Sequence, residues 1–353
     1  MTTATPVAPV VMAKPRLVVL ATLFGVLAVA VALVSLSYGT TKIPVSEVLG
    51  ALLGTGDSGT MLVVREFRLP RVATGLLVGI AFAVSGALLQ TLSRNALASP
   101  DIIGVNSGAS AAAVSVIVFA GSAGGVSGFA AKVGVPLAAI GGGLLATLLV
   151  GLLSMQRGVV DAGRVVLIGV GVAAAANSLV AWLLVLGDVM DAGRAAAWLA
   201  GSLNARSWAD ATPVAVAVVV LVPLAMTFGR DLSALVLGDD VASSLGVRVS
   251  RTRLALLIIA TLLAAVATAG AGPIAFVALV SPQIAQRLAK ADRPPLMATA
   301  MLGGLFVVLA DLVARTGLET LGVGPYELPV GVVTAACGAP YLIHLIGRQQ
   351  KGR

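Results

Sequence analysis

The chain of 353 residues consists of long apolar runs separated by short charged segments. A helix needs roughly 20 residues to cross about 30 Å of hydrocarbon, so each uncharged gap of about that length predicts one membrane span. The gaps of this kind lie between Arg16 and Lys42, Arg71 and Arg94, Asp101 and Lys132, Lys132 and Arg157, Arg164 and Asp188, Asp210 and Arg230, Arg253 and Arg287, Arg293 and Asp311, and Glu327 and Arg348.

The gap between Arg253 and Arg287 is too long for one helix and contains Gly270-Ala271-Gly272-Pro273, which should break it. We therefore expect a helix over about 254–271 and a shorter one over about 274–290, which brings the number of spans to about ten. Both ends of the chain are basic, and the positive-inside rule then requires an even number of crossings with both termini in the cytoplasm. The first apolar run exceeds a signal-peptide core, so we expect it to be retained.

Composition supports this interpretation. Hydrophobic residues make up 58% of the chain and charged residues 11%, against roughly 25% charged in soluble domains. A soluble globule and a disordered chain are excluded, and the single cysteine, Cys337, excludes a disulfide framework. The net charge of +8 requires no nucleic acid, because membrane proteins keep Lys and Arg on the cytoplasmic side. The predicted fold is an all-α polytopic membrane protein in the cell membrane, with a tail over 1–16, one transmembrane domain over 17–347 and a tail over 348–353.

Some kinds of chemistry are not expected. The chain has no G-x-x-x-x-G-K-[ST] phosphate loop, so we do not expect it to hydrolyse ATP itself, and His344 has no cluster of metal ligands beside it in the sequence. Asp311 is the only ionisable residue well inside a predicted span, and Arg315 follows it at i+4. A local ion pair is the expected role. The alternative is a proton relay in an ion-coupled secondary transporter, which would place carboxylates near the midplane.

Two loops concentrate the remaining charge. The loop after the first span holds Lys42, Arg65, Arg68 and Arg71 on the side where cations are disfavoured. An acidic docking partner would account for them, and so would anchoring to lipid phosphate or arginines that cap helix ends.

The second loop, over about 229–253, is predicted to be cytoplasmic. Its segment 237–246 contains Asp239 and Asp240, the apolar i, i+4 pair Val241 and Leu245, and a terminal Gly246, a pattern that predicts a short amphipathic helix. Such a helix would bind a soluble partner or lie on the lipid surface. The two acids disfavour the lipid surface, because the inner leaflet is itself negative.

Several motifs occur in order along the chain. They are Arg68-Leu69-Pro70-Arg71, the segments 85–90 and 94–100 with Gly104, the loop 237–246, Gly272-Pro273-Ile274-Ala275-Phe276 with Pro282, Ala310-Asp311 with Arg315, and Glu327-Leu328-Pro329-Val330-Gly331 followed by Gly338-Ala339-Pro340. Taken together, these motifs resemble those of the FecCD-type permeases, the membrane subunits of type II ABC importers for ferric siderophores, haem and cobalamin. The resemblance covers nearly the whole chain, although Ala96, Ala278 and Gln283 stand where the family often has Pro, Gly and His.

The resemblance implies partners and sites. Two permeases, identical or paralogous, enclose a pathway, while two ATP-binding cassette subunits hold ATP and Mg²⁺ and bind the coupling loop; the permease itself holds no cofactor or metal. A lipid-anchored or periplasmic substrate-binding protein docks on Arg68, Arg71 and Arg315. The expected coupling residues are Leu237, Gly238, Asp239, Asp240, Ala242, Leu245 and Gly246, and the pathway or hinge candidates are Gln90, Asn95, Pro100, Gly272, Pro273, Pro282, Pro329 and Gly331.

The function this implies is ATP-driven import of a ferric siderophore by alternating access, without bond chemistry in this chain. The same role for cobalamin or haem is the alternative within the family. The alternative class is the ion-coupled secondary transporter, whose uptake would survive loss of ATP.

Overall fold

The structure is a computed structural model that describes residues 15–39, 41–122, 133–156, 159–160, 162–320, 322, 324 and 326–351. The regular secondary structure of the described residues is helical apart from one antiparallel pair of two-residue strands, β1 (Met155–Gln156) and β2 (Val159–Val160). The all-α fold class is therefore confirmed. Of the predicted tails, residues 1–14 and 352–353 lie outside the described residues, while α1 begins at Pro15 and α15 continues to Lys351.

The long helices follow the predicted spans one by one. Among the described residues, seven helices are long and apolar enough to cross a membrane: α1, α6, α7, α9, α12, α14 and the helix that includes α4. The helices α5 and α15 contribute shorter apolar stretches, and α13, with 13 residues, reaches only about 20 Å. Their bounds are α1 (Pro15–Ser37), α4 (Leu69–Ser93), α5 (Val105–Ser122), α6 (Val135–Ser154), α7 (Ala162–Leu186), α9 (Trp208–Thr227), α12 (Val249–Ala271), α13 (Val277–Ala289), α14 (Leu296–Thr320) and α15 (Val330–Lys351).

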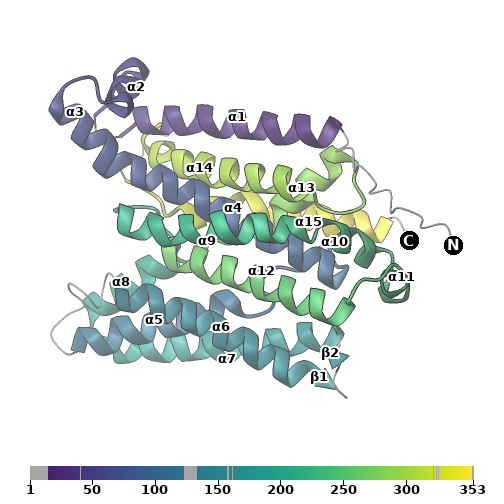
Figure 1. Ribbon diagram of the computed structural model, residues 1–353. Helices are drawn as coiled ribbons and strands as arrows, with labels where there is room; N and C mark the ends of the chain where they lie inside the picture. Colours follow the sequence, from purple (N-terminus) through teal and green to yellow (C-terminus); the bar gives the residue numbers. More distant parts are fainter. Residues whose placement is uncertain are drawn as a thin grey trace.

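The short helices gather at the two ends of this bundle (Figure 1). At one end, the α2 end, lie α2 (Val45–Leu53), α3 (Ser58–Leu62), the π-helical turn η1 (Val63–Arg68) and α8 (Val189–Leu199). The opposite end, the α11 end, carries α10 (Gly229–Val236) and α11 (Asp239–Ser244). The helix α1 begins and α15 ends at the α11 end, which agrees with an even number of crossings.

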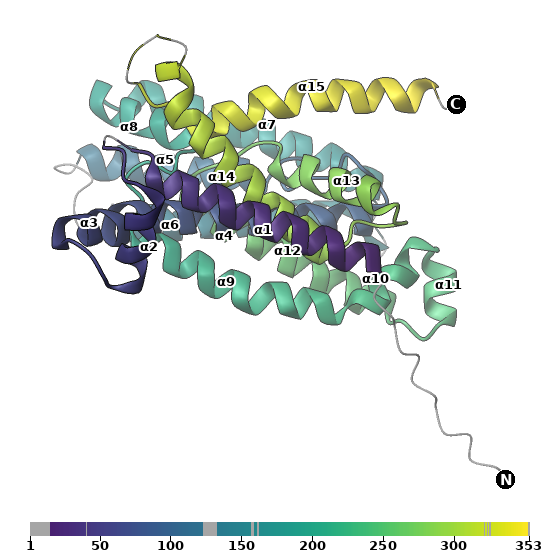
Figure 2. The ribbon, with the colours of Figure 1, turned by 90° about the horizontal axis from the view of Figure 1, so that it is seen from above.

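The helix α4 forms the centre of the bundle and packs against α9, α12, α13 and α14 (Figures 1 and 2). Its side chains Phe82 and Leu88 are fully buried. Glycines allow its neighbours to approach closely: a Cβ at Gly79 would overlap the Gly303 carbonyl of α14, and a Cβ at Gly86 would overlap the Ala278 carbonyl of α13. The peripheral helices α1 and α7 instead bury few of their residues, as helices that face lipid do.

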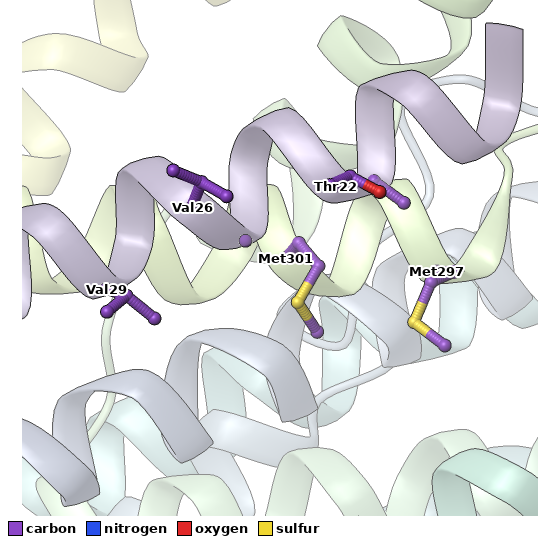
Figure 3. Close-up of a pocket in the computed structure, with 7 residues that line it drawn as sticks. Thr22, Val26, Val29, Met297 and Met301 are labelled. Atoms are coloured by element: carbon purple, nitrogen blue, oxygen red, sulfur yellow. The ribbon is translucent and has the colours of Figure 1, made fainter.

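A shallow groove of about 490 Å³ lies between α1 and α14 (Figure 3). The two methionines of α14 that line it, Met297 and Met301, lie against a stretch of α1 that is among the most apolar in the chain. Thr22 is the one lining side chain with a hydroxyl. The groove therefore suits hydrocarbon and offers few polar groups to a metal chelate. Its lining residues are Ala21, Thr22, Gly25, Val26, Val29, Met297 and Met301.

Candidate functional site

The predicted break within the Arg253 to Arg287 gap is present. The helix α12 ends at Ala271 and α13 begins at Val277. Gly272 has φ of +76°, a conformation that glycine adopts without strain, and Pro273 follows it. The free end of α12 is held from outside the helix, because Ser202 N donates to Ala271 O over 2.9 Å.

Three glycines from distant segments meet at this break, in what we call the glycine junction: Gly201, Gly272 and Gly331. A Cβ on any of them would overlap a backbone carbonyl, that of Pro273, Trp198 or Ala200 respectively. Gly331 N also donates to Gly201 O over 3.1 Å. The structure thus brings together three of the hinge candidates, Gly272, Pro273 and Gly331. No local pattern marks Gly201, because its partners are distant in the chain.

Gln90 and Pro282 are also brought together. Pro282 has no N–H, so Ala278 O loses its donor within α13. Gln90 Nε2 supplies one from α4, at 3.5 Å from Ala278 O and 3.1 Å from Leu279 O, and Gln283 Nε2 donates to Gln90 Oε1 over 2.7 Å. Both glutamines are buried. Gln90 therefore fastens the proline turn of α13 to α4, and Gln283 forms part of that contact.

The other pathway candidates lie in connections between helices. Asn95 is exposed between α4 and α5 and accepts a hydrogen bond from Leu97 N through its side chain. Pro100 is buried, and its carbonyl accepts from Val105 N at the start of α5. Pro329 precedes α15 and is partly buried. Their part in transport stays a prediction.

The loop at the α11 end folds as predicted into a short helix. Gly238 and Gly246 flank α11 with φ of +116° and +84°, which favours glycine at both positions. Ala242 is buried against the bundle. Leu237, Val241 and Leu245 remain between 44% and 65% exposed, and we call these three side chains the α11 apolar surface.

Asp239 fixes this helix to the bundle. Arg253 donates to its two carboxylate oxygens over 2.8 and 2.9 Å, and Arg94 pairs with it from the end of α4. The hydrogen bonds from Arg253, together with the nearby charge of Arg253 and Arg94, lower the pKa of the Asp239 carboxyl. No side chain caps the start of α11 at Gly238. Asp239 therefore serves as an ion-pair partner and not as a helix cap. Asp240 contributes its carbonyl, which accepts from the hydroxyls of Ser243 and Ser244.

The α2 end holds a cluster of charged residues, which we call the arginine cluster: Arg68, Arg71, Asp311, Arg315 and Glu327. Asp311 is 2% exposed. Arg71 reaches it from α4, with Nη2 at 2.9 Å from Oδ1, and Arg315 Nε lies 3.2 Å from Oδ2. Arg71 Nη1 also contacts Glu327 Oε2 at 3.0 Å. The predicted pair of Asp311 with Arg315 is confirmed, and the sequence did not indicate the contribution of Arg71.

At the α2 end, arginine side chains cap the ends of helices. Arg68 donates to Leu36 O over 2.7 Å and to Thr41 O over 2.6 Å, while Arg315 donates to Tyr38 O over 3.1 Å and to Ser35 O over 3.3 Å. These acceptors include the last carbonyls of α1, which have no partner within that helix. Arg65 does the same for α2, through Ala51 O and Leu52 O. Helix capping, one of the explanations for the cations of this loop, is therefore present. Docking at Arg68, Arg71 and Arg315 stays a prediction.

Comparison with known proteins identifies the family. The model of the FecCD transport family matches residues 27–348. The ferric enterobactin transport system permease protein FepG of Escherichia coli (strain K12) is 40% identical over 314 residues, which are 89% of this chain and 91% of that protein. The iron(3+)-hydroxamate import system permease protein FhuG of Bacillus subtilis (strain 168) is 38% identical, over 94% of this chain and 97% of its own.

A solved structure has the same fold. It is an inward-facing conformation of a metal-chelate type ABC transporter, with a TM-score of 0.78 and 26% identity, over 93% of this chain and 98% of the other. The family match and the relatives each span nearly the full length, and several helices suit a membrane. The protein is accordingly a multi-pass membrane protein that belongs to the FecCD transport family.

Proposed function

We propose that this chain is the membrane-spanning permease subunit of an ATP-driven importer of ferric siderophores. Full-length similarity to permease proteins of ferric enterobactin and iron(3+)-hydroxamate systems supports the substrate class. The observation that carries the mechanism is the α11 apolar surface, which is exposed at one end of the bundle and held there by ion pairs. The chain performs no bond chemistry of its own, and ATP and Mg²⁺ are held by the two partner ATPase subunits.

The α11 end is the cytoplasmic end in this proposal, and the ATPase subunits bind there. Leu237, Val241 and Leu245 enter a groove on the ATPase, because exposed apolar side chains gain most from burial. Asp239 then passes the movement of α11 to Arg94 at the end of α4 and to Arg253 at the start of α12. Since α4 and α12 are the most buried spans, their displacement repacks the bundle between two states.

The remaining partners follow from the same proposal. A second permease, identical or paralogous, pairs with this chain around the pathway; ferric enterobactin permeases FepG and FepD of Escherichia coli, 40% and 39% identical to it, illustrate two related permeases. The α2 end faces outward and receives a lipid-anchored or periplasmic binding protein at Arg68, Arg71 and Arg315. Of these arginines, Arg71 is the one whose carboxylate partner Glu327 reaches the surface.

The test of this function is uptake by the complete transporter in liposomes, with the binding protein and a ferric siderophore outside and ATP inside. We expect uptake to stop when ATP is omitted and to continue when an ionophore dissipates the ion gradients. Uptake that survives without ATP and collapses with the ionophore would instead support an ion-coupled secondary transporter.

The substrate is tested separately. We expect the binding protein purified with this permease to carry the absorption spectrum of a ferric catecholate or hydroxamate. A haem or cobalamin spectrum would replace the ferric siderophore as substrate and leave the permease role intact.

A further inference from the structure

Arg71 holds two carboxylates that differ in burial. Asp311 has 3% of its side chain exposed and is bound by Arg71 and Arg315 together. Glu327 has 42% of its side chain exposed, and among the described residues its carboxylate contacts Arg71 alone, at 3.0 Å. The Asp311 contact is also multidentate, because Nε and Nη2 of Arg71 both donate to it.

The two contacts must therefore differ in strength. An exposed ion pair contributes little, since water competes for both partners. If a buried carboxylate separated from its two guanidinium partners, their positive charges would be uncompensated in the interior. Asp311 is accordingly the permanent partner of Arg71, and Glu327 is the replaceable one.

We propose that Glu327 is an internal competitor for the docking partner, and that docking exchanges it for an acidic side chain of the binding protein on Arg71 Nη1. This inference rests on the proposed docking at the α2 end. The incoming carboxylate and Glu327 are chemically equivalent ligands, so the exchange leaves the charge on Arg71 matched throughout. Arg71 stays desolvated and bound to Asp311 while only its surface-facing nitrogen changes partner.

Through this exchange, docking at the surface would affect the segment that leads into α15. Glu327 begins the segment that leads into α15, and the next residue, Leu328, donates its N–H to Ala314 O over 3.0 Å. Four residues after Glu327, Gly331 joins the glycine junction against Gly201. Release of Glu327 loosens this segment at one end while the junction holds the other.

The first experiment measures binding of the transporter's own binding protein to the permease complex in lipid nanodiscs. Glu327→Gln removes the competing charge, and Glu319→Gln is the matched control, since Glu319 is an exposed acid in the last turn of α14 at the same end. We expect Glu327→Gln to raise the affinity roughly two- to fivefold, the range that exposed ion pairs span. Glu319→Gln should change it less, because among the described residues Arg71 pairs with Asp311 and Glu327 and not with Glu319. Equal effects of the two variants would overturn the exchange.

The second measurement needs no variant. Hydrogen exchange of the wild-type segment 326–331 should become faster when the binding protein is added, because Glu327 has lost Arg71. Slower or unchanged exchange in a complex that demonstrably forms would contradict the proposal.

A salt titration of the same complex distinguishes failure of arginine docking from failure of the Glu327 exchange. An affinity for the binding protein that does not depend on salt would refute arginine docking itself. A salt-dependent affinity that Glu327→Gln and Glu319→Gln change equally would refute only the exchange.

Discussion

The two ends of the bundle use the same ion pairing of arginine with aspartate to opposite effect. At the α2 end, Arg71 and Arg315 enclose Asp311 with little exposure on any of the three side chains. At the α11 end, Arg94 and Arg253 hold an Asp239 that is 46% exposed. The first arrangement binds helices to one another inside the bundle. The second positions a short helix so that its apolar side chains stay available to a partner.

The burial of each ion pair determines how much it contributes to the free energy of unfolding. A buried pair that loses one member leaves an unmatched charge in a medium of low dielectric, which costs about 3–5 kcal/mol. An exposed pair exchanges readily with water and contributes roughly 0.2–1 kcal/mol. The buried Asp311 pair at the α2 end should therefore govern stability, and the exposed Asp239 pair at the α11 end should govern how firmly α11 is held.

The largest effect is expected for Asp311→Asn. The variant leaves Arg71 and Arg315 without their shared carboxylate, and we expect it to lower the free energy of unfolding by about 3–5 kcal/mol. Thermal unfolding in detergent measures the loss. Glu327→Gln is the control, since it removes a carboxylate from the exposed side of Arg71 and should cost no more than about 1 kcal/mol. Equal melting temperatures for the two variants would remove the distinction between the two carboxylates.

Leu245→Asp should have the next largest effect, on association and not on stability. It removes an exposed apolar side chain whose burial is worth about 1.5–3 kcal/mol and adds a charge to the contact. We expect ATPase binding to weaken at least about tenfold, as measured by co-purification and titration. Ser250→Asp adds the same charge at the exposed start of α12 and should bind nearly normally. Normal ATPase binding by Leu245→Asp would exclude the α11 apolar surface as the contact.

Asp239→Asn should have a smaller effect. The amide keeps the shape of the side chain and loses its charge, so α11 should be held less firmly by about 0.2–1 kcal/mol. Hydrogen exchange over residues 237–246 should accelerate by up to about fivefold. The matched variant Asp240→Asn should change little, because the interactions of Asp240 that we describe use its carbonyl.

The smallest effect concerns pH. Because the pKa of Asp239 is lowered in the folded protein, its contribution is complete above the unfolded value of about 3.9 and is lost as the pH falls through the folded value. Exchange over 237–246, corrected for the intrinsic effect of pH, should be constant from about pH 8 to pH 5 and rise only below about pH 4. Loosening of α11 between pH 7 and pH 5 would contradict this assignment.

Local and one-dimensional features could be predicted from the sequence. The spans followed from gaps between charges, because charged side chains are excluded from hydrocarbon, and the end of α12 followed from Gly272 and Pro273. The helix α11 followed from the spacing of Val241 and Leu245 within a polar loop. Each of these depends on residues that are close together in the chain.

Contacts between distant segments could not be predicted. Arg71 and Asp311 are 240 positions apart, and no periodicity links them. Helix capping was one of three explanations for the cations of this loop, but the sequence could not indicate that Arg68 caps α1, because the acceptor Leu36 O lies 32 positions away. The role of Gln90 depends on the missing N–H of Pro282 in another helix. Such pairings require the packing of the whole bundle.

In the proposed mechanism, charge mediates association at the α2 end and apolar contact mediates it at the α11 end. The most direct test titrates one preparation of the permease with the binding protein and with the ATPase, each at about 0.05 M and 0.5 M salt. We expect the affinity for the binding protein to fall at least about tenfold at the higher salt and the affinity for the ATPase to change by less than about threefold. Equal salt dependence at the two ends, or a stronger dependence for the ATPase, would contradict the claim.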